Sequence, residues 1–468
     1  MFASMLGCAG AWRSWSVLQR LCTRINYKLA LPTGRQFALI ITLYTFQQKV
    51  ILGIRKQRRT QQVMDDLITD SRYSWVRLGL TLFVATIINA GMWAIIVIMP
   101  AIEAEYGGTR AMVSLPYTLT MVGFALGNYI IGRAVDHFGI TASLIVAAIM
   151  TAIGFGLATL SSSLLILSFT QLMVGFASAV GFGPLIADIS HWFVRRRGIA
   201  VAIAASGNYL SGAIWPILLA KVLAENGWRA VYIVMAAVTL FAVIPLALAL
   251  RRRLPQQVQT AAQKTSLANA KTVGLSPRAL QYLLGFAGIG CCVAMSMPQV
   301  HIVAYCVDLG FGPAVGAQML SLMLLFGVVS RIISGLVADI LGGVQTLLIG
   351  SCLQCLALFL YLPSSGMVSL YVVSLVFGLS QGGIVPSYAL VVREYMPAKE
   401  AGARVGFVMM ATILGMALGG WLSGLTYDLS GSYTLAFLNG IIWNSANITV
   451  IIWLILRSRA SMSASAAA

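Results

Sequence analysis

The chain has 468 residues, of which 59% are hydrophobic and only 9% are charged, and its formal net charge is +18. Soluble globular proteins carry about 25% charged residues, and a mean hydropathy of +0.88 is too apolar for a chain that folds in water. The composition therefore excludes a soluble fold and indicates a protein that folds in a lipid bilayer.

The chain opens with a basic segment. Residues 1–64 contain ten Lys or Arg and no acid, and the apolar run Phe37–Phe46 is about half the roughly 20 residues that a spanning helix needs. We favour a true translation start at Met64. The alternatives are a basic amphipathic arm on the membrane surface and an organelle transit peptide.

Apolar runs of about 20 residues recur after this extension, separated by short polar breaks. The runs are continuous rather than alternating and are rich in Leu, Ala and Gly, so they predict helices rather than strands. The expected spans lie near 76–99, 112–131, 140–160, 163–187, 199–222, 230–250, 279–305, 316–338, 343–362, 367–391, 403–425 and 433–456. The sequence thus predicts an all-α membrane protein with twelve transmembrane helices.

The basic residues predict the orientation of these spans. With both termini in the cytosol, the inner loops and the C-terminus carry fifteen Lys or Arg, whereas the outer side holds only Arg110, Lys221 and Arg229. This positive-inside bias accounts for the positive net charge, so the charge reflects membrane topology and does not indicate nucleic-acid binding. We expect a plasma (inner) membrane protein whose basic inner loops contact anionic lipid.

The first half of the chain repeats in the second at an offset of about 203 residues. GRAVDHFG at 132–139 and GLVADILG at 335–342 share the pattern GxxxDxxG, and GFASAVGFGP at 175–184 pairs with GLSQGGIVP at 378–386. Two parallel six-helix halves with a site near the midplane are typical of transporters that rock around a fixed site. The expected parts are the extension 1–74, the halves 75–250 and 279–457, the cytoplasmic linker 251–278 and the tail 458–468.

Several motifs resemble a known family over nearly all of 75–457. GRAVDHFG resembles the signature between helices 2 and 3 of the major facilitator superfamily. NAGMW at 89–93, WFVRRRGIAVAIAASG at 192–207 and SRIISGLVAD at 330–339 resemble its monocarboxylate transporter and oxalate/formate antiporter branch. The resemblance implies the major facilitator fold and transport of small organic carboxylates.

The repeated motif also supplies candidate gating residues. Asp136 and Asp339 lie at predicted cytoplasmic helix ends, where a carboxylate can bind a helix N-terminus or a loop arginine and hold one conformation shut. The alternative is a merely solvated helix end. His137 and Ile140 stand where the signature is usually basic, which weakens the expected charge clamp. The gating candidates are Gly132, Arg133, Asp136, Gly139 and Asp339.

Arg331 is the main candidate for binding substrate. It lies eight residues before Asp339, about 12 Å deeper along a helix, on the same side as Gly327, Ser334 and Gly335. A face of small residues packs against protein rather than lipid tails, so the guanidinium should point inward. No acid falls near the midplane, and the missing anion is most simply a substrate carboxylate. The alternatives are snorkelling to the inner surface and bonding to helix carbonyls.

The resemblance supports the first interpretation, because an arginine at this place in helix 8 of the resembled branch is the carboxylate ligand. Helix 11 lacks the second cation found in some relatives, and one fixed charge fits a monocarboxylate better than a dianion. Other polar residues in the spans are candidates to line the site or, alternatively, to join helices. They are Asn89, Trp93, Asn208, Tyr209, Gln299, His301, Gln381 and Tyr388. His301 is also a candidate proton carrier.

The sequence therefore predicts a secondary active transporter of small organic carboxylates that works by alternating access, with proton symport or anion exchange. It contains no GxxxxGK[ST] loop, no cluster of metal ligands and no convincing catalytic triad, so we expect no enzyme, cofactor or metal. The alternatives are a multidrug or metabolite exporter of the same superfamily and a carrier-like receptor that does not transport. A monomer is the expected state.

Overall fold

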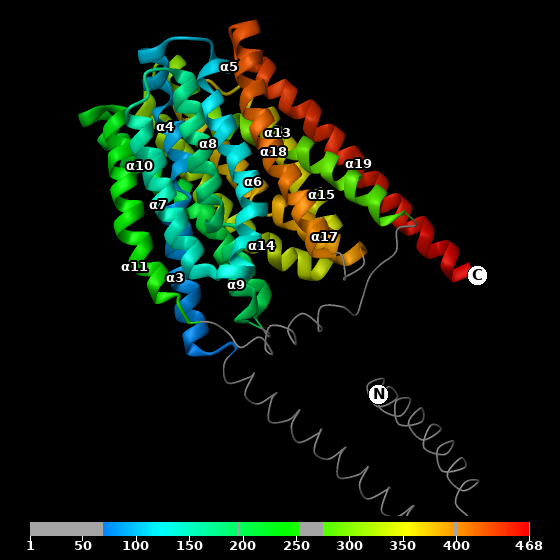
Figure 1. The fold of residues 1–468 in the computed structure, drawn as a ribbon. Helices are drawn as coiled ribbons and strands as arrows, with labels where there is room; N and C mark the ends of the chain where they lie inside the picture. The colour runs from blue at the N-terminus through cyan, green and yellow to red at the C-terminus, as the bar shows by residue number, and fades with distance from the viewer. Residues whose placement is uncertain (1–68, 194–195, 253–274, 397–400, 468) are drawn as a thin grey trace, which may run out of the picture. The chain divides into compact units, whose positions relative to one another are not determined.

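The structure is a computed structural model that describes residues 69–193, 196–252, 275–396 and 401–467, and these are almost entirely helical (Figure 1). The extension up to residue 68, including Met64, and most of the linker lie outside the described residues. The helices are α3 (Arg72–Ile88), α4 (Ala90–Tyr106), α5 (Arg110–Val113), α6 (Leu115–Phe138), α7 (Ile140–Thr159), α8 (Leu164–Ser178), α9 (Gly183–His191), α10 (Arg197–Val238), α11 (Ile244–Ala249), α13 (Pro277–Asp308), α14 (Pro313–Leu341), α15 (Gly343–Tyr361), α16 (Met367–Gln381), α17 (Ile384–Tyr395), α18 (Ala401–Ser430) and α19 (Thr434–Ala467).

Hydroxyl side chains define where several helices begin. Ser71, Ser163 and Ser276 precede α3, α8 and α13, and each side-chain oxygen accepts a hydrogen bond from the backbone N–H three residues further on. Thr109 caps α5 in the same way. The first N–H groups of a helix have no partner inside it, and each of these caps satisfies one of them.

The predicted repeat extends to the backbone conformation. Gly139 follows α6 with φ 84° and ψ 164°, and Gly342 follows α14 with φ 89° and ψ 168°. Gly107 and Gly310, at the same offset, form a second pair with φ of 66° and 81°. Side chains with a Cβ rarely adopt positive φ, so glycine recurs where the two halves make equivalent turns.

Ten helical stretches of the described residues are long and apolar enough to cross a membrane. The predicted fifth and sixth spans belong to one stretch, Gly198–Ala249, in which the chain turns at Gly227 with φ 78°. The helix α6 is not among the ten. The helical fold is therefore confirmed, whereas the count of twelve spans stays a prediction.

Glycines let neighbouring helices approach closely. A Cβ added to Gly175 of α8 would lie 1.9 Å from the carbonyl oxygen of Thr120 in α6. A Cβ on Gly378 of α16 would lie 2.2 Å from the carbonyl oxygen of Met323 in α14. In lipid, such close backbone packing replaces the hydrophobic effect as the force that holds helices together.

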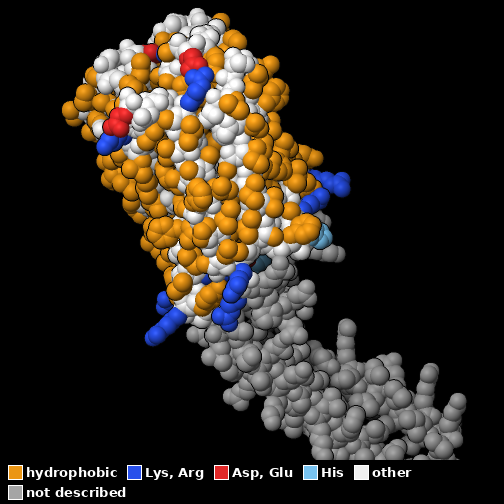
Figure 2. Space-filling view, turned by 60° about the vertical axis from the view of Figure 1, so that its left-hand side comes forward, with side chains coloured by type: hydrophobic (Ala, Val, Ile, Leu, Met, Phe, Trp, Pro, Cys, Tyr) orange, Lys and Arg blue, Asp and Glu red, His pale blue; other side chains and the backbone are white. Residues whose placement is uncertain are grey.

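Hydrophobic side chains cover most of the face shown in Figure 2, and acidic side chains appear only near its upper end. This upper end contains α5, whereas α9 lies at the opposite end of the bundle (Figure 1). We call them the α5 end and the α9 end; the positive-inside pattern predicts that the α5 end faces outward.

The close contact at Gly175 leads to a stability prediction. Gly175→Ala should destabilise the protein by about 1–3 kcal/mol, because the new methyl group collides with a backbone atom that cannot move aside alone. Gly156→Ala in α7 is the matched control, since its Cβ would meet no atom within 4 Å. Melting curves in detergent should show a lower apparent Tm for the first variant only; equal curves would contradict the packing.

Candidate functional site

Arg331 lies at the contact between the two predicted halves. Its side chain is 4% exposed and extends from α14. Nε donates a hydrogen bond to the carbonyl oxygen of Gly382 at 3.0 Å, and Nη1 donates to the carbonyl oxygen of Ala205 in α10 at 2.5 Å. The guanidinium carbon lies 4.1 Å from the ring centre of Tyr209, also in α10. The guanidinium thus joins both halves through neutral partners.

Two other buried arginines have carboxylate partners. Arg77 in α3, 1% exposed, forms an ion pair with Asp188 at 2.8 Å. Arg110 in α5, 8% exposed, pairs with Asp308 at 2.6 Å. No carboxylate among the described side chains forms an ion pair with Arg331. Its positive charge is therefore not neutralised by the part of the protein that the structure describes.

Of the predicted site residues, Tyr209 contacts this guanidinium, and Trp93 and Asn208 are bonded to each other beside Tyr209. Tyr209 stacks on Arg331 directly, and Gly327 leaves room for its ring, because a Cβ there would lie 2.8 Å from a ring carbon. Trp93 in α4 donates its indole N–H to the carbonyl oxygen of Asn208 at 3.0 Å. Tyr209 and its neighbours therefore form the α10 side of the site.

Gln299 and Gln381 form a buried amide pair in the C-terminal half. Nε2 of Gln299 donates to Oε1 of Gln381 at 2.6 Å, and both side chains are 0% exposed. The other oxygen of Gln299 and the other nitrogen of Gln381 have no hydrogen-bond partner. If both amides were flipped, one donor and one acceptor would still remain unpaired. Gln381 directly precedes Gly382, to which Arg331 is bonded.

Three further candidates lie elsewhere. Asn89 donates to the carbonyl oxygens of Ala85 and Gly181 within the N-terminal half, although its Oδ1 is unpaired. Tyr388 donates to Asn447 at 2.6 Å within the C-terminal half. His301 bonds near the α5 end, as described below. Their described bonds join helices and do not reach Arg331.

The gating candidates are described only in part. Arg133 lies with its guanidinium carbon 4.4 Å from the ring centre of Tyr129, and Gly139 makes the turn with positive φ. A Cβ on Gly132 would meet no atom within 4 Å. The side chains of Asp136 and Asp339 lie outside the described residues, so the gating role stays a prediction.

An ion-pair cluster at the α5 end joins the two halves. We call it the latch; its members are Glu103, Arg110, Asp308, Asp428 and Tyr433. Arg110 pairs through Nε with Glu103 at 3.0 Å and through Nη2 with Asp308 at 2.6 Å. Asp428 accepts hydrogen bonds from the backbone N–H groups of Arg110 and Ala111, at 2.7 and 2.8 Å.

The sequence pattern does not predict the latch, because ion pairs between helix ends that are far apart in the chain leave no local signal. The first two members come from α4 and α5 and the others from α13, α18 and the residue before α19. Glycine brings these elements together, since a Cβ on Gly424 of α18 would lie 2.7 Å from the carbonyl oxygen of Arg110. The only sequence signal was an arginine and several acids at predicted outer helix ends.

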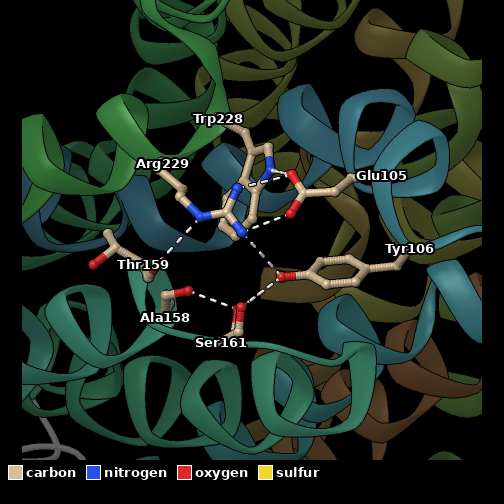
Figure 3. A network of polar contacts seen from close by, with 7 residues as sticks. All are labelled: Glu105, Tyr106, Ala158, Thr159, Ser161, Trp228 and Arg229. Carbon is tan, nitrogen blue, oxygen red and sulfur yellow. Dashed lines mark hydrogen bonds and ion pairs between the residues drawn. The ribbon is translucent and has the colours of Figure 1, made fainter.

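A second ion-pair network at this end lies within the N-terminal half (Figure 3). Arg229 pairs with Glu105 at 2.6 Å and donates to the carbonyl oxygen of Thr159. Trp228 donates its indole N–H to the same carboxylate at 2.6 Å. Because this network joins α4, α7 and α10 without crossing to the other half, it offers a control for the latch.

Comparison with known proteins identifies the family. The sequence model of the Major Facilitator Superfamily matches residues 81–403 and 308–468. The chain belongs to the major facilitator superfamily. Its members are transporters, so this superfamily chain is a multi-pass integral membrane transporter rather than an enzyme.

Relatives within the superfamily include monocarboxylate transporters. The chain is 29% identical to monocarboxylate transporter 13 of Bos taurus over 317 residues, covering 66% of the chain and 72% of that protein. It is 27% identical to human monocarboxylate transporter 11, covering 66% and 67%, and 25% identical to MFS-type transporter 1 of an Ophiocordyceps fungus, covering 65% and 67%. The predicted superfamily and its monocarboxylate transporter-like branch are confirmed.

A solved structure shows the same fold. A bacterial homolog of the human lysosomal transporter Spinster, in an inward-facing and occupied conformation, matches 84% of this chain and 97% of its own with a TM-score of 0.60. Its sequence identity is 14%, so the likeness concerns the fold alone.

The latch leads to a conformational prediction. Arg110→Gln should open the α5 end, because truncating a buried charge pair costs about 2–5 kcal/mol and the ion pair with Asp308 exists only while the halves touch. Spin labels on Met112→Cys in α5 and Leu429→Cys in α18, both exposed, report the separation by pulsed electron resonance in a cysteine-free background.

The control is Arg229→Gln, which breaks the network of Figure 3. The distance between the two spin labels should lengthen in the Arg110→Gln variant and stay unchanged in the Arg229→Gln variant. The same lengthening in both would show that any lost charge loosens this end, and that the latch has no special role.

Proposed function

We propose that this transporter carries small organic carboxylates, most simply monocarboxylates, by alternating access, and that Arg331 binds the carboxylate. One observation carries the proposal. Of the three buried arginines described above, Arg77 and Arg110 have carboxylate partners, whereas Arg331 is bonded to neutral groups. A carbonyl accepts a hydrogen bond but does not neutralise a buried charge, so an anionic substrate is the partner that this guanidinium lacks.

The position of Arg331 supports a role in alternating access. Its Nη1 bond to Ala205 and its stacking on Tyr209 both cross from α14 to α10. A substrate carboxylate that displaced the Ala205 carbonyl would change a contact between the halves as well as neutralise the charge. A ligand shifts a conformational equilibrium only through such differential contacts.

The number of charges supports a monocarboxylate. Arg331 is the single cation of this site among the described side chains, and a planar guanidinium binds one carboxylate in bidentate geometry. A dicarboxylate would leave its second charge without a cation there. Transport of lipophilic cations, as by a multidrug exporter, would instead require a buried carboxylate.

The structural alternative for Arg331 is that its bonds to Gly382 and Ala205 are its whole role. That interpretation accounts for two of its donors but leaves the charge without a counter-ion. The two interpretations differ in what happens to uptake when the guanidinium is removed, which makes the alternative testable.

The decisive experiment measures uptake of labelled mono- and dicarboxylates into proteoliposomes by the wild type, Arg331→Gln and Arg331→Lys. For the acid that is carried best, kcat/KM should fall at least about 30-fold in Arg331→Gln, equivalent to about 2 kcal/mol. Lys should restore uptake only in part, because it lacks the planar fork. Undiminished uptake by a correctly inserted Gln variant would leave Arg331 a structural role.

The same assay tests the coupling mode. Proton symport predicts that an inward proton gradient drives accumulation, whereas anion exchange predicts that unlabelled anion trapped inside accelerates uptake. The comparison needs no variant, because the gradient and the trapped anion are applied separately.

The unpaired amide atoms predict selectivity for substrates with a polar group beyond the carboxylate. Gln299 and Gln381 offer one acceptor and one donor, which a hydroxyl can satisfy together. Gln381→Leu should therefore reduce uptake of a hydroxylated acid by about 5–10-fold relative to the unsubstituted acid of equal length, since a net hydrogen bond is worth about 1 kcal/mol. An unchanged ratio between the two acids would mean that the pair binds water or only joins helices.

A further inference from the structure

His301 is a residue of α13 that lies next to the latch. Its imidazole is 0% exposed, and both ring nitrogens are within hydrogen-bond distance of a protein atom. Nε2 lies 2.8 Å from the carbonyl oxygen of Gly420 in α18, and Nδ1 lies 3.2 Å from Oη of Tyr433. The structure thus ties this histidine to two elements of the C-terminal half.

These bonds fit a neutral imidazole. A carbonyl oxygen only accepts, so Nε2 must carry a hydrogen. Tyr433 accepts a hydrogen bond from Nη1 of Arg110 at 3.5 Å, and in the neutral form its own hydroxyl hydrogen can point at Nδ1 of His301. The bonds therefore run in one direction, from Arg110 through Tyr433 and His301 to Gly420.

A proton on Nδ1 would reverse this direction. Nδ1 would become a donor to Oη of Tyr433, the same atom that accepts from Arg110, and the phenol hydrogen would have to leave its place. A second cation would then be separated from the Arg110 guanidinium only by the phenol of Tyr433, at a buried position. Both effects disfavour the arrangement that holds Arg110 in the latch.

In the closed arrangement, the nearby carboxylates are bonded to the Arg110 segment rather than to His301. Glu103 and Asp308 pair with Arg110, and Asp428 accepts from the backbone at the start of α5. All three carboxylates are thus engaged by the Arg110 segment. The titratable groups around His301 are Glu103 of α4, Arg110 of α5, Tyr117 of α6, Tyr305 and Asp308 of α13, Tyr427 and Asp428 of α18, and Tyr433.

The contact between the halves covers His301 from the N-terminal side. A Cβ on Gly420, whose carbonyl accepts from His301, would lie 2.9 Å from a ring carbon of Tyr117 in α6. Separation of α6 from α18 would remove this cover and let water reach the imidazole. Hydration lowers the cost of a charged ring, so the protonated form is compatible with an open α5 end.

We propose that His301 is a proton-binding site that controls the latch: the neutral imidazole completes the closed α5 end, and a proton taken up from the solution at that end opens it. The proton adds to Nδ1 and leaves again before closure. The role differs from that of a substrate ligand and does not depend on what Arg331 binds.

Proton binding to His301 and opening of the α5 end are thermodynamically linked, and this linkage fixes the sign of the pH dependence. Because the proton binds better to the open form, acid raises the open population and alkali restores closure. Opening should occur over the range in which histidine titrates, around neutral pH and below.

The test uses the full chain with spin labels on Met112→Cys and Leu429→Cys, reconstituted in lipid nanodiscs without substrate. Lowering the pH from about 8 to about 5 should raise the open-to-closed ratio at least about fivefold, the lower end of common coupling strengths. His301→Gln supplies a neutral donor and acceptor that cannot be protonated in this range, so its closed population should stay constant.

The controls separate folding from titration. His301→Gln must show the parental closed distance at high pH, and Arg110→Gln should be open throughout. A pH response that persists unchanged in His301→Gln would assign the effect to the latch carboxylates and overturn the proposal, as would a parent that does not respond. Because no substrate is present, neither outcome bears on the role of Arg331.

Discussion

Lipid offers no hydrogen bonds, and this constraint organises the structure. Every buried polar group must find its partner inside the protein or carry the cost of remaining unpaired. Arg77 and Arg110 meet the constraint with carboxylate partners. Arg331 meets the constraint only in part. Its Nε and Nη1 donate hydrogen bonds to carbonyl oxygens, but its positive charge has no described counter-ion.

In the described part of the chain, arginine side chains join the halves at two places. At the α5 end, Arg110 ties α5 to α13 by an ion pair, and α18 packs closely through Gly424. Deeper in the bundle, Arg331 ties α14 to α10 through Ala205 and Tyr209. The proposed rocking of the halves would break these contacts, so a ligand or proton that alters either one would bias the equilibrium.

The helical fold and the family could be predicted with little ambiguity. Apolar runs of spanning length admit few structures in lipid, and the GxxxDxxG repeat extends to Gly139 and Gly342, which share one backbone conformation. The burial of Arg331 was also predictable from the small residues beside it. The partners of Arg331 were not, because Ala205 and Gly382 contribute backbone carbonyls, which any residue type possesses.

By itself, the sequence determined that the chain crosses a membrane as helices, and it predicted two repeated halves and a buried arginine with no acid near it. These properties follow from composition and spacing along the chain. Only the tertiary structure decided that Arg110 crosses to Asp308, that His301 belongs with Tyr433 rather than with Arg331, and that Gln299 meets Gln381. Each of these pairs joins residues that are more than eighty positions apart, and helix packing, not local pattern, sets which side chains meet.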